Sequence, residues 1–98
     1  MNPAPLLWHY IYLLRSKKNR EFYVGCTSNI EKRFKEHKKG INYHTRKMLP
    51  VELIYVEAYK SKKDAYEREK KLKYHGSALR NLKSRIKDTI YESEGGAG

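Results

Sequence analysis

The first part of the chain contains two short segments rich in aromatic and β-branched residues, separated by a polar stretch. The segments are Leu7–Arg15 (LWHYIYLLR) and Glu21–Thr27 (EFYVGCT), with Ser16–Arg20 (SKKNR) between them. Aromatic and β-branched residues favour strands, and so short a polar connection brings two strands together as an antiparallel hairpin. This hairpin limits the fold most, because a sheet that begins antiparallel must be covered by the elements that follow it.

A helix is expected directly after the hairpin. Ser28 is a candidate N-cap, and Glu31, three residues later, completes a capping box. The helix should run to about Lys39 and end at Gly40, since glycine is a common C-terminal signal. A basic loop, Ile41–Leu49 (INYHTRKML), follows it.

The rest of the domain adds one strand and two helices. Val51–Tyr59 (VELIYVEAY) predicts a third strand. Ser61 can cap a second helix that continues to about Tyr74, and Ser77 can cap a third that ends near Ile90. The order ββαβαα predicts an α+β domain, a small three-stranded antiparallel sheet flanked by three helices. We therefore divide the chain into an N-terminal tail (1–7), one domain (8–90) and a flexible C-terminal tail (91–98).

The net charge points to a polyanionic partner. The 98 residues include 22 Lys and Arg against 11 Asp and Glu, a formal charge of +11. Such an excess favours nucleic acid, although a protein that is merely basic would show the same total. The cations lie within patterned segments instead of a terminal block, so the basic surface should belong to the folded body.

Several other classes of protein are disfavoured. Cys26 is the single cysteine, so no disulfide and no cysteine-based zinc site can form within the chain. No apolar run approaches the length of about 18 residues that a membrane span needs, and no secretory signal is evident. We expect a cytoplasmic protein that does not bind membranes.

Two tyrosines of the hairpin are candidates for chemistry. If Ser16 pairs with Glu21, Tyr12 lies opposite Gly25, and Tyr23 is its diagonal neighbour on the same face. Gly25 has no side chain and would leave a hollow beside Tyr12. Aromatic residues are also ordinary strand residues, so a hairpin of core aromatics explains the pattern as well.

The helices supply further candidates. Arg33 and His37 are four residues apart and share one face of the first helix, although a surface Arg and His would be unremarkable. On the second helix, Glu69 lies on the inward stripe marked by Ala65, Leu72 and the ring of Tyr66. An inward carboxylate needs a partner, which could be a metal ion, Arg33 or a lysine. Asn81, on the third helix, could simply face solvent.

These residues form an ordered set. Tyr10-Ile11-Tyr12 and Tyr23-Val24-Gly25 are followed by Arg33, His37, Glu69 and Asn81. The set resembles the GIY-YIG nuclease superfamily, in particular its small single-domain bacterial members, and is similar to the nuclease module of the excision-repair incision protein. Tyr10 replaces the glycine that opens the first motif, and the additional domains of larger relatives are absent.

The resemblance implies a metal-dependent endonuclease that hydrolyses phosphodiester bonds, with DNA favoured over RNA and a role in repair, recombination or processing. Glu69 would hold one Mg²⁺ or Mn²⁺ ion and Arg33 the scissile phosphate. Tyr12 would act as the base with help from His37, Tyr23 would support it, and Asn81 would orient Glu69 or the phosphate. The expected nucleic-acid contacts are Lys32, Arg46, Lys47 and Lys73. The alternative is a module that binds DNA or structured RNA without cleaving it, and in either case we expect a monomer.

Overall fold

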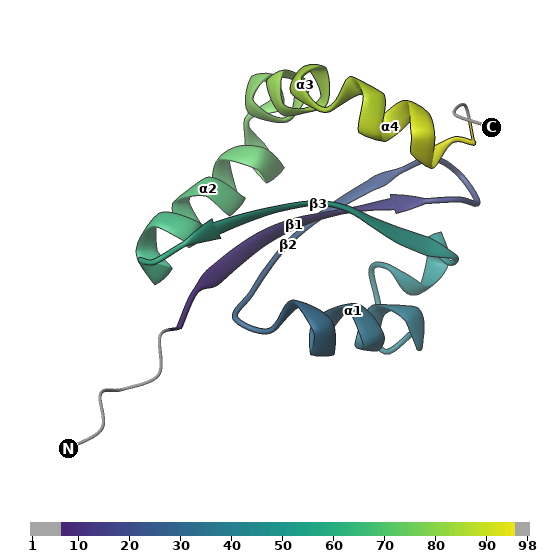
Figure 1. Cartoon of the computed structure of the whole chain (residues 1–98). Coiled ribbons are helices and arrows are strands. Elements are labelled where there is room, and N and C mark those ends of the chain that lie inside the picture. Colours follow the sequence, from purple (N-terminus) through teal and green to yellow (C-terminus); the bar gives the residue numbers. More distant parts are fainter. Residues whose placement is uncertain (1–6, 96–98) are drawn as a thin grey trace.

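The predicted hairpin forms with the expected register. In the computed structural model, which describes residues 7–95, strands β1 (His9–Ser16) and β2 (Phe22–Thr27) pair antiparallel (Figure 1). Tyr12 lies opposite Gly25, and the Ser16 amide donates to the Glu21 carbonyl over 2.8 Å. The strands begin slightly later than expected. Residues 1–6 and 96–98 of the expected tails lie outside the described residues.

The third strand completes an antiparallel sheet. β3 (Val51–Tyr59) pairs with the other side of β1, so the strand order is β2-β1-β3. The central position of β1 explains its burial, because every side chain from Ile11 to Ser16 is buried. A bulge between Leu13 and Leu14 shifts the register with β3. The three-stranded antiparallel sheet and the α+β class are confirmed.

Helix α1 (Ile30–Lys38) begins at a different cap from the one expected. Asn29, not Ser28, is the N-cap, and its side-chain oxygen accepts from the Lys32 amide over 3.0 Å. The Asn29 amide in turn donates to the Thr27 hydroxyl, which closes the turn between β2 and α1. Past the helix, Gly40 has φ +77°, a backbone conformation that glycine adopts readily.

The third predicted helix is divided in two. α2 (Lys62–Tyr74) starts at Ser61 and ends at Tyr74 as expected. α3 (Gly76–Arg85) has His75, not Ser77, at its N-cap position, and it ends at Ile86, where α4 (Lys87–Ser93) begins. The described chain therefore has four α-helices and one short 3₁₀ helix, η1 (Arg46–Met48).

Helix α4 extends past residue 90, where the sequence suggested that a flexible tail begins. Glu94, directly after α4, forms an ion pair with Arg15 of β1. Arg15 is buried and its guanidinium also lies 4.2 Å from the centroid of the Phe22 ring. A buried guanidinium needs an anionic partner, which is why the end of α4 is held against the sheet.

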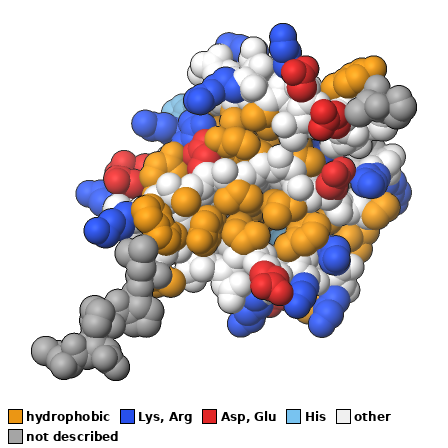
Figure 2. Space-filling view, in the orientation of Figure 1, with side chains coloured by type: hydrophobic (Ala, Val, Ile, Leu, Met, Phe, Trp, Pro, Cys, Tyr) orange, Lys and Arg blue, Asp and Glu red, His pale blue; other side chains and the backbone are white. Residues whose placement is uncertain are grey.

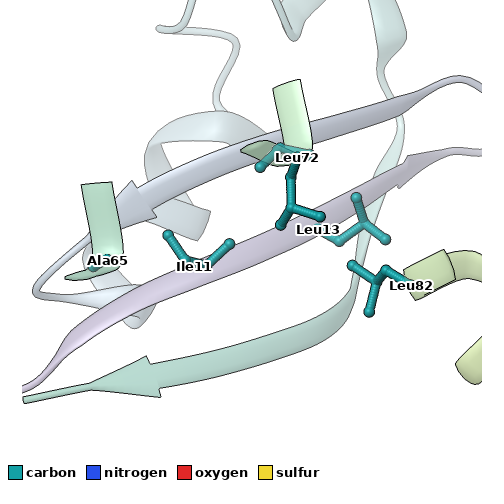
Figure 3. Packing of buried hydrophobic residues seen from close by; sticks show 6 residues of the cluster. Ile11, Leu13, Ala65, Leu72 and Leu82 are labelled. Atoms are coloured by element: carbon teal, nitrogen blue, oxygen red, sulfur yellow. The ribbon is translucent and has the colours of Figure 1, made fainter. Parts of the chain in front are cut away.

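The sheet separates two hydrophobic clusters. Figure 1 shows α2, α3 and α4 on one side of the sheet and α1 on the other. Side chains from β1, β2, α2 and α3 make the first cluster; Ile11, Leu13, Ala65, Leu72 and Leu82 are seen in Figure 3. The second cluster lies on the α1 side and contains Tyr12, Leu14, Met48 and Val51. The α1 side therefore presents Tyr12, and with it the candidate site.

Charged and apolar side chains divide the surface. In the view of Figure 2, hydrophobic side chains form a band across the middle of the molecule, and the Lys and Arg side chains visible on this face lie mainly around it. Within residues 7–95, none of the helices has the length and apolar character that crossing a membrane requires.

Candidate active site

The two motif tyrosines lie on the same face of the hairpin. Their ring centroids are 6.4 Å apart, and Tyr12 is 3% exposed whereas Tyr23 is half-buried. Gly25 provides the predicted hollow: a Cβ at this position would overlap the phenol ring and hydroxyl of Tyr12. The tyrosine pair is thus built by strand alternation and by one missing side chain, as the register predicted.

His37 is buried beside both tyrosines. Its Nε2 is 2.7 Å from the Tyr12 hydroxyl, and its ring centroid lies 5.3 Å from that of Tyr23. The His37 side chain has no exposure to solvent. Burial, together with the nearby Arg33 charge, lowers its pKa to about 4, so the imidazole is neutral at pH 7. His37 is therefore not the ordinary surface histidine that the sequence also allowed.

A residue that the sequence did not suggest completes this group. The hydroxyl of Thr45 lies 2.7 Å from Nδ1 of His37, and Thr45 is fully buried. Thr45 comes from the basic loop, directly before η1. Nothing in the local sequence marks a threonine in a polar loop as a histidine partner, so only the fold reveals it.

The environment of Tyr12 keeps its hydroxyl protonated. Burial and the nearby charges of Tyr23 and Glu69 raise the pKa of Tyr12 to about 12, although the Arg33 guanidinium opposes the shift. A cation close to a phenol favours the phenolate, but in the free protein burial outweighs it. Arg33 is half-buried, and its Nη1 lies 3.3 Å from a carboxylate oxygen of Glu36.

Glu69 reaches the same region from α2. Its side chain is 20% exposed, and its Oε2 lies 3.3 Å from Nζ of Lys73. Nζ of Lys73 also lies 5.7 Å from the centroid of the Tyr23 ring, which connects the carboxylate to the tyrosine face. Of the partners the sequence allowed, a lysine is the one observed. Tyr66 is 48% exposed and so does not mark the inner face with Ala65 and Leu72, as we had expected.

The site offers one carboxylate for a cation. Among residues 7–95, no group of three or more His, Cys, Asp or Glu side chains is placed to hold a metal ion. A cage made by protein alone is thus not present in the described part of the chain. Mg²⁺ is commonly bound by one or two carboxylates while water and substrate phosphate oxygens fill its other positions. Glu69, which is partly exposed and is linked to the tyrosine face through Lys73, suits this second mode.

The other predicted residues lie further out. Asn81 is exposed on α3. Its side-chain amide makes no hydrogen bond to any described residue, so the structure does not join it to Glu69 or the tyrosines. Lys32 is exposed on α1. Arg46 and Lys47 are exposed on η1, and each cation lies 5.0 Å from the centroid of the exposed Tyr43 ring.

Comparison with known proteins gives consistent matches. The family model of the GIY-YIG catalytic domain matches residues 8–83. The UPF0213 protein CPE1444 of Clostridium perfringens is 37% identical over 90 residues, which cover 88% of this chain and 96% of that protein. The UPF0213 protein BLi00048/BL00536 of Bacillus licheniformis is 46% identical over 63 residues, or 62% of this chain and 63% of that protein. The solution NMR structure of the UPF0213 protein BH0048 from Bacillus halodurans is 30% identical, covers 79% of this chain and 86% of its own, and has a TM-score of 0.49.

Proposed function

The chain belongs to the GIY-YIG family of nucleases, and from this premise we propose that it is a metal-dependent endonuclease that hydrolyses phosphodiester bonds, with DNA favoured over RNA. The observation that carries the proposal is the buried hydrogen bond between Tyr12 and His37, with Arg33 and Glu69 acting on the same phenol. A buried phenol that is hydrogen-bonded to an imidazole and feels the charges of a guanidinium and a carboxylate is more than packing requires.

The phenol and the imidazole can move the proton of an attacking water. The water gives a proton to the Tyr12 oxygen while the Tyr12 hydroxyl proton passes to Nε2 of His37, 2.7 Å away. The oxygen of the resulting hydroxide forms a bond to phosphorus, the bond from phosphorus to the leaving oxygen breaks, and solvent protonates that oxygen. His37 then returns its proton through Tyr12 to the hydroxide that this leaves in solvent, which restores the neutral imidazole. Since Tyr12 accepts one proton as it loses another, no free phenolate is needed, which suits its raised pKa.

Arg33 is placed to hold the scissile phosphate. Its guanidinium lies beside the Tyr12 hydroxyl, and its ion-pair partner Glu36 is 3.3 Å away and about one-third exposed. A guanidinium can donate two parallel hydrogen bonds to a phosphate, which fixes both its position and its orientation. We assign Lys32, Lys73, Arg46 and Lys47 to contacts with the nucleic-acid backbone on either side of that phosphate.

Glu69 would hold the metal ion, Mg²⁺ or Mn²⁺. When bound, such an ion would neutralise charge on the phosphate and stabilise the leaving oxygen. In the free protein the Glu69 carboxylate forms an ion pair with Lys73, whose Nζ is 3.3 Å away. The metal ion must therefore displace this lysine, whose side chain is one-third exposed. Ion pairs of this exposure contribute only about 1 kcal/mol or less to stability, so displacing the lysine costs a metal ion little binding free energy.

The test is a cleavage assay on plasmid and synthetic DNA and RNA, with Mg²⁺ and Mn²⁺ titrated separately. Glu69→Gln should reduce cleavage by at least about a hundredfold, because an amide is a much weaker ligand for a hard cation. Glu67→Gln is the matched control, since it removes an exposed carboxylate from the same helix. Equal activity of the two variants would exclude Glu69 as the metal ligand.

Arg33→Ala should lower the cleavage rate more than the affinity, because it contacts one phosphate among several. Arg80→Ala removes an exposed arginine from α3 and should change neither. Tight binding by the native protein without cleavage, in any metal and on any substrate, would favour the alternative of a non-cleaving binding module.

A further inference from the structure

A buried line of two hydrogen bonds connects the basic loop to the catalytic phenol. The Thr45 hydroxyl lies 2.7 Å from Nδ1 of His37, and Nε2 of the same ring lies 2.7 Å from the Tyr12 hydroxyl. Thr45 and His37 have no exposure and Tyr12 is 3% exposed. Both ring nitrogens are therefore engaged by protein, and water does not reach the imidazole.

The donor at each bond follows from what the neighbours of Tyr12 can accept. A guanidinium has only donors, so Arg33 cannot take the Tyr12 hydroxyl proton. Among the described residues, the acceptor that faces this hydroxyl is Nε2 of His37, which must then carry no proton. His37 is neutral at pH 7 and holds one ring proton, which must be on Nδ1. The Thr45 hydroxyl oxygen is the acceptor facing Nδ1.

We propose that Thr45 is a positioning residue that fixes the Nδ1-protonated tautomer of His37 and so keeps Nε2 free to receive the Tyr12 proton. Thr45 itself touches neither the substrate nor the reacting atoms. The catalytic consequence rests on the proposed nuclease function, whereas the tautomer is a property of the free protein. A group that accepts from one nitrogen of a catalytic imidazole determines which tautomer is present.

The loop is built to hold Thr45 in place. The Asn42 side-chain oxygen accepts from the amides of His44 (2.9 Å) and Thr45 (3.1 Å). The Met48 amide donates to the Thr45 carbonyl over 2.9 Å, and the Met48 carbonyl accepts from the buried Ser16 hydroxyl over 2.6 Å. Hydrogen bonds through Met48 thus connect the Thr45 backbone to β1, and this fixes the position from which the Thr45 hydroxyl extends toward His37.

The first experiment is NMR of the full chain labelled with ¹⁵N at histidine, recorded near neutral pH without metal or nucleic acid. The ¹⁵N shifts of His37 should show a protonated Nδ1 and an unprotonated Nε2 in the native protein and in Thr45→Ser, which keeps the hydroxyl. Valine has a similar shape but no hydroxyl acceptor, so the ¹⁵N shifts of His37 in Thr45→Val should move toward those of the other tautomer or of a mixture. A native His37 protonated on Nε2 would overturn the proposal, even if no variant folds.

The second experiment measures cleavage by the same proteins. Thr45→Val should lower kcat roughly tenfold or more with little change in KM, the loss expected for a group that orients a catalytic histidine. Thr45→Ser should restore most of it. Thr89→Val, on α4 across the sheet, is the matched control and should cleave as the native protein does. Unchanged His37 shifts and unchanged kcat in Thr45→Val would reduce Thr45 to a packing residue.

The two readouts separate the two proposals. If the native protein cleaves no substrate, the nuclease proposal fails, while the NMR shifts still decide whether Thr45 sets the tautomer. If the native protein cleaves and Thr45→Val keeps both its shifts and its rate, the Thr45 proposal alone fails.

Discussion

At the scale of single residues, the Tyr12 phenol has very little freedom. Gly25 faces one side of the ring so closely that a Cβ would overlap it, and His37 engages the hydroxyl. The Tyr23 ring lies 6.4 Å away, centroid to centroid, at an angle of 44°. A side chain held this tightly is oriented in advance, which suits the role proposed for Tyr12, because such orientation lowers the entropic cost of reaching a reactive geometry.

We expect Gly25→Ala to damage both the site and the fold. The new methyl group would force the Tyr12 ring to move and break its hydrogen bond to His37, so cleavage should fall by at least about a hundredfold. Overpacking of this kind costs about 1–3 kcal/mol of unfolding free energy. Urea denaturation and the cleavage assay measure the two effects.

Gly76→Ala is the control for Gly25→Ala. A Cβ at Gly76, the first residue of α3, would meet no atom within 4 Å. The same substitution should there be neutral or stabilise by a few tenths of a kcal/mol up to about 1 kcal/mol. Gly25→Ala would contradict the structure if it were as stable and as active as Gly76→Ala.

The buried imidazole predicts a pH dependence of stability. Burial, reinforced by Arg33, lowers the pKa of His37 from 6.5 to about 4 in the folded protein, so between these values the unfolded chain binds the extra proton. The unfolding free energy should therefore fall as the pH is lowered from 6.5 toward 4, by up to about 3 kcal/mol from this group. Denaturation across this pH range should show a shallower fall in His37→Gln. His44→Gln, which removes an exposed histidine, should keep the native slope.

Side-chain periodicity predicts only some of these residues. Alternation along the strands placed Tyr12, Tyr23 and Gly25 correctly, because the register of a short hairpin follows from its turn. The partner of His37 could not be predicted, since Thr45 belongs to a loop whose path depends on hydrogen bonds to β1. Asn81 shows the opposite case, a residue of the expected type and spacing whose exposed amide joins none of the group.

At the scale of elements, a second polar cluster fixes α2 on the sheet. The Glu57 carboxylate of β3 accepts hydrogen bonds from the hydroxyls of Tyr55 and Tyr59, each over 2.7 Å. Arg68 of α2 donates to it from Nη2 (2.8 Å) and Nε (3.0 Å). Burial alone would raise the pKa of Glu57, but these donors, Arg68 foremost, hold it below its ordinary value. Because Arg68 directly precedes Glu69, the cluster also sets where the proposed metal ligand lies.

We expect Arg68→Met to destabilise the protein by about 2–3 kcal/mol, because it leaves the largely buried Glu57 carboxylate without its cation. Cleavage should fall as well, since α2 is no longer held in register. Adding Glu57→Gln should recover part of the stability, and a double-mutant cycle by chemical denaturation measures this coupling.

The exposed pair of Glu31 and Lys35 is the control for the cluster on α2. Their side chains are 83% and 63% exposed, and the charged atoms are 3.3 Å apart. Lys35→Met should cost less than about 1 kcal/mol. A similar loss in Arg68→Met and Lys35→Met would mean that the Glu57 cluster contributes no more than a surface ion pair.

Element boundaries differ from prediction where two residues compete or where packing decides. Ser28 and Asn29 are both good caps, and the turn that Thr27 closes selects Asn29. No glycine or proline separates α3 from α4, yet the chain turns at Ile86 (φ −112°, ψ 30°), which is half-buried and packs against the first cluster. Such a break comes from tertiary contacts and leaves no local sequence signal.

At the scale of the whole molecule, the sheet separates the larger aliphatic cluster from most residues of the candidate site. The side covered by α2 and α3 holds the larger cluster of aliphatic side chains, while the α1 side carries the tyrosines, His37 and the basic loop (Figure 1). Fold class was predictable because strand, cap and turn signals agree along the chain. The approach of Glu69 from α2 to residues on the α1 side was expected from the family resemblance alone, since periodicity describes one element at a time.

The formal charge of +11 predicts that binding to nucleic acid weakens steeply as the salt concentration rises. The position of each Lys or Arg predicts how much its removal changes this salt dependence. Arg46→Ala and Lys47→Ala, on the loop beside the site, should each weaken binding and reduce the slope of log K against log salt by about 1, as expected when one phosphate contact is lost. Lys87→Ala removes the same charge from α4 on the other side of the sheet and should leave the slope nearly unchanged. Fluorescence anisotropy with a labelled oligonucleotide over a salt series measures all four proteins. If the nucleic-acid backbone follows a defined path along the loop, the slopes for Lys47→Ala and Lys87→Ala must differ. Equal slopes would show that net charge alone governs binding.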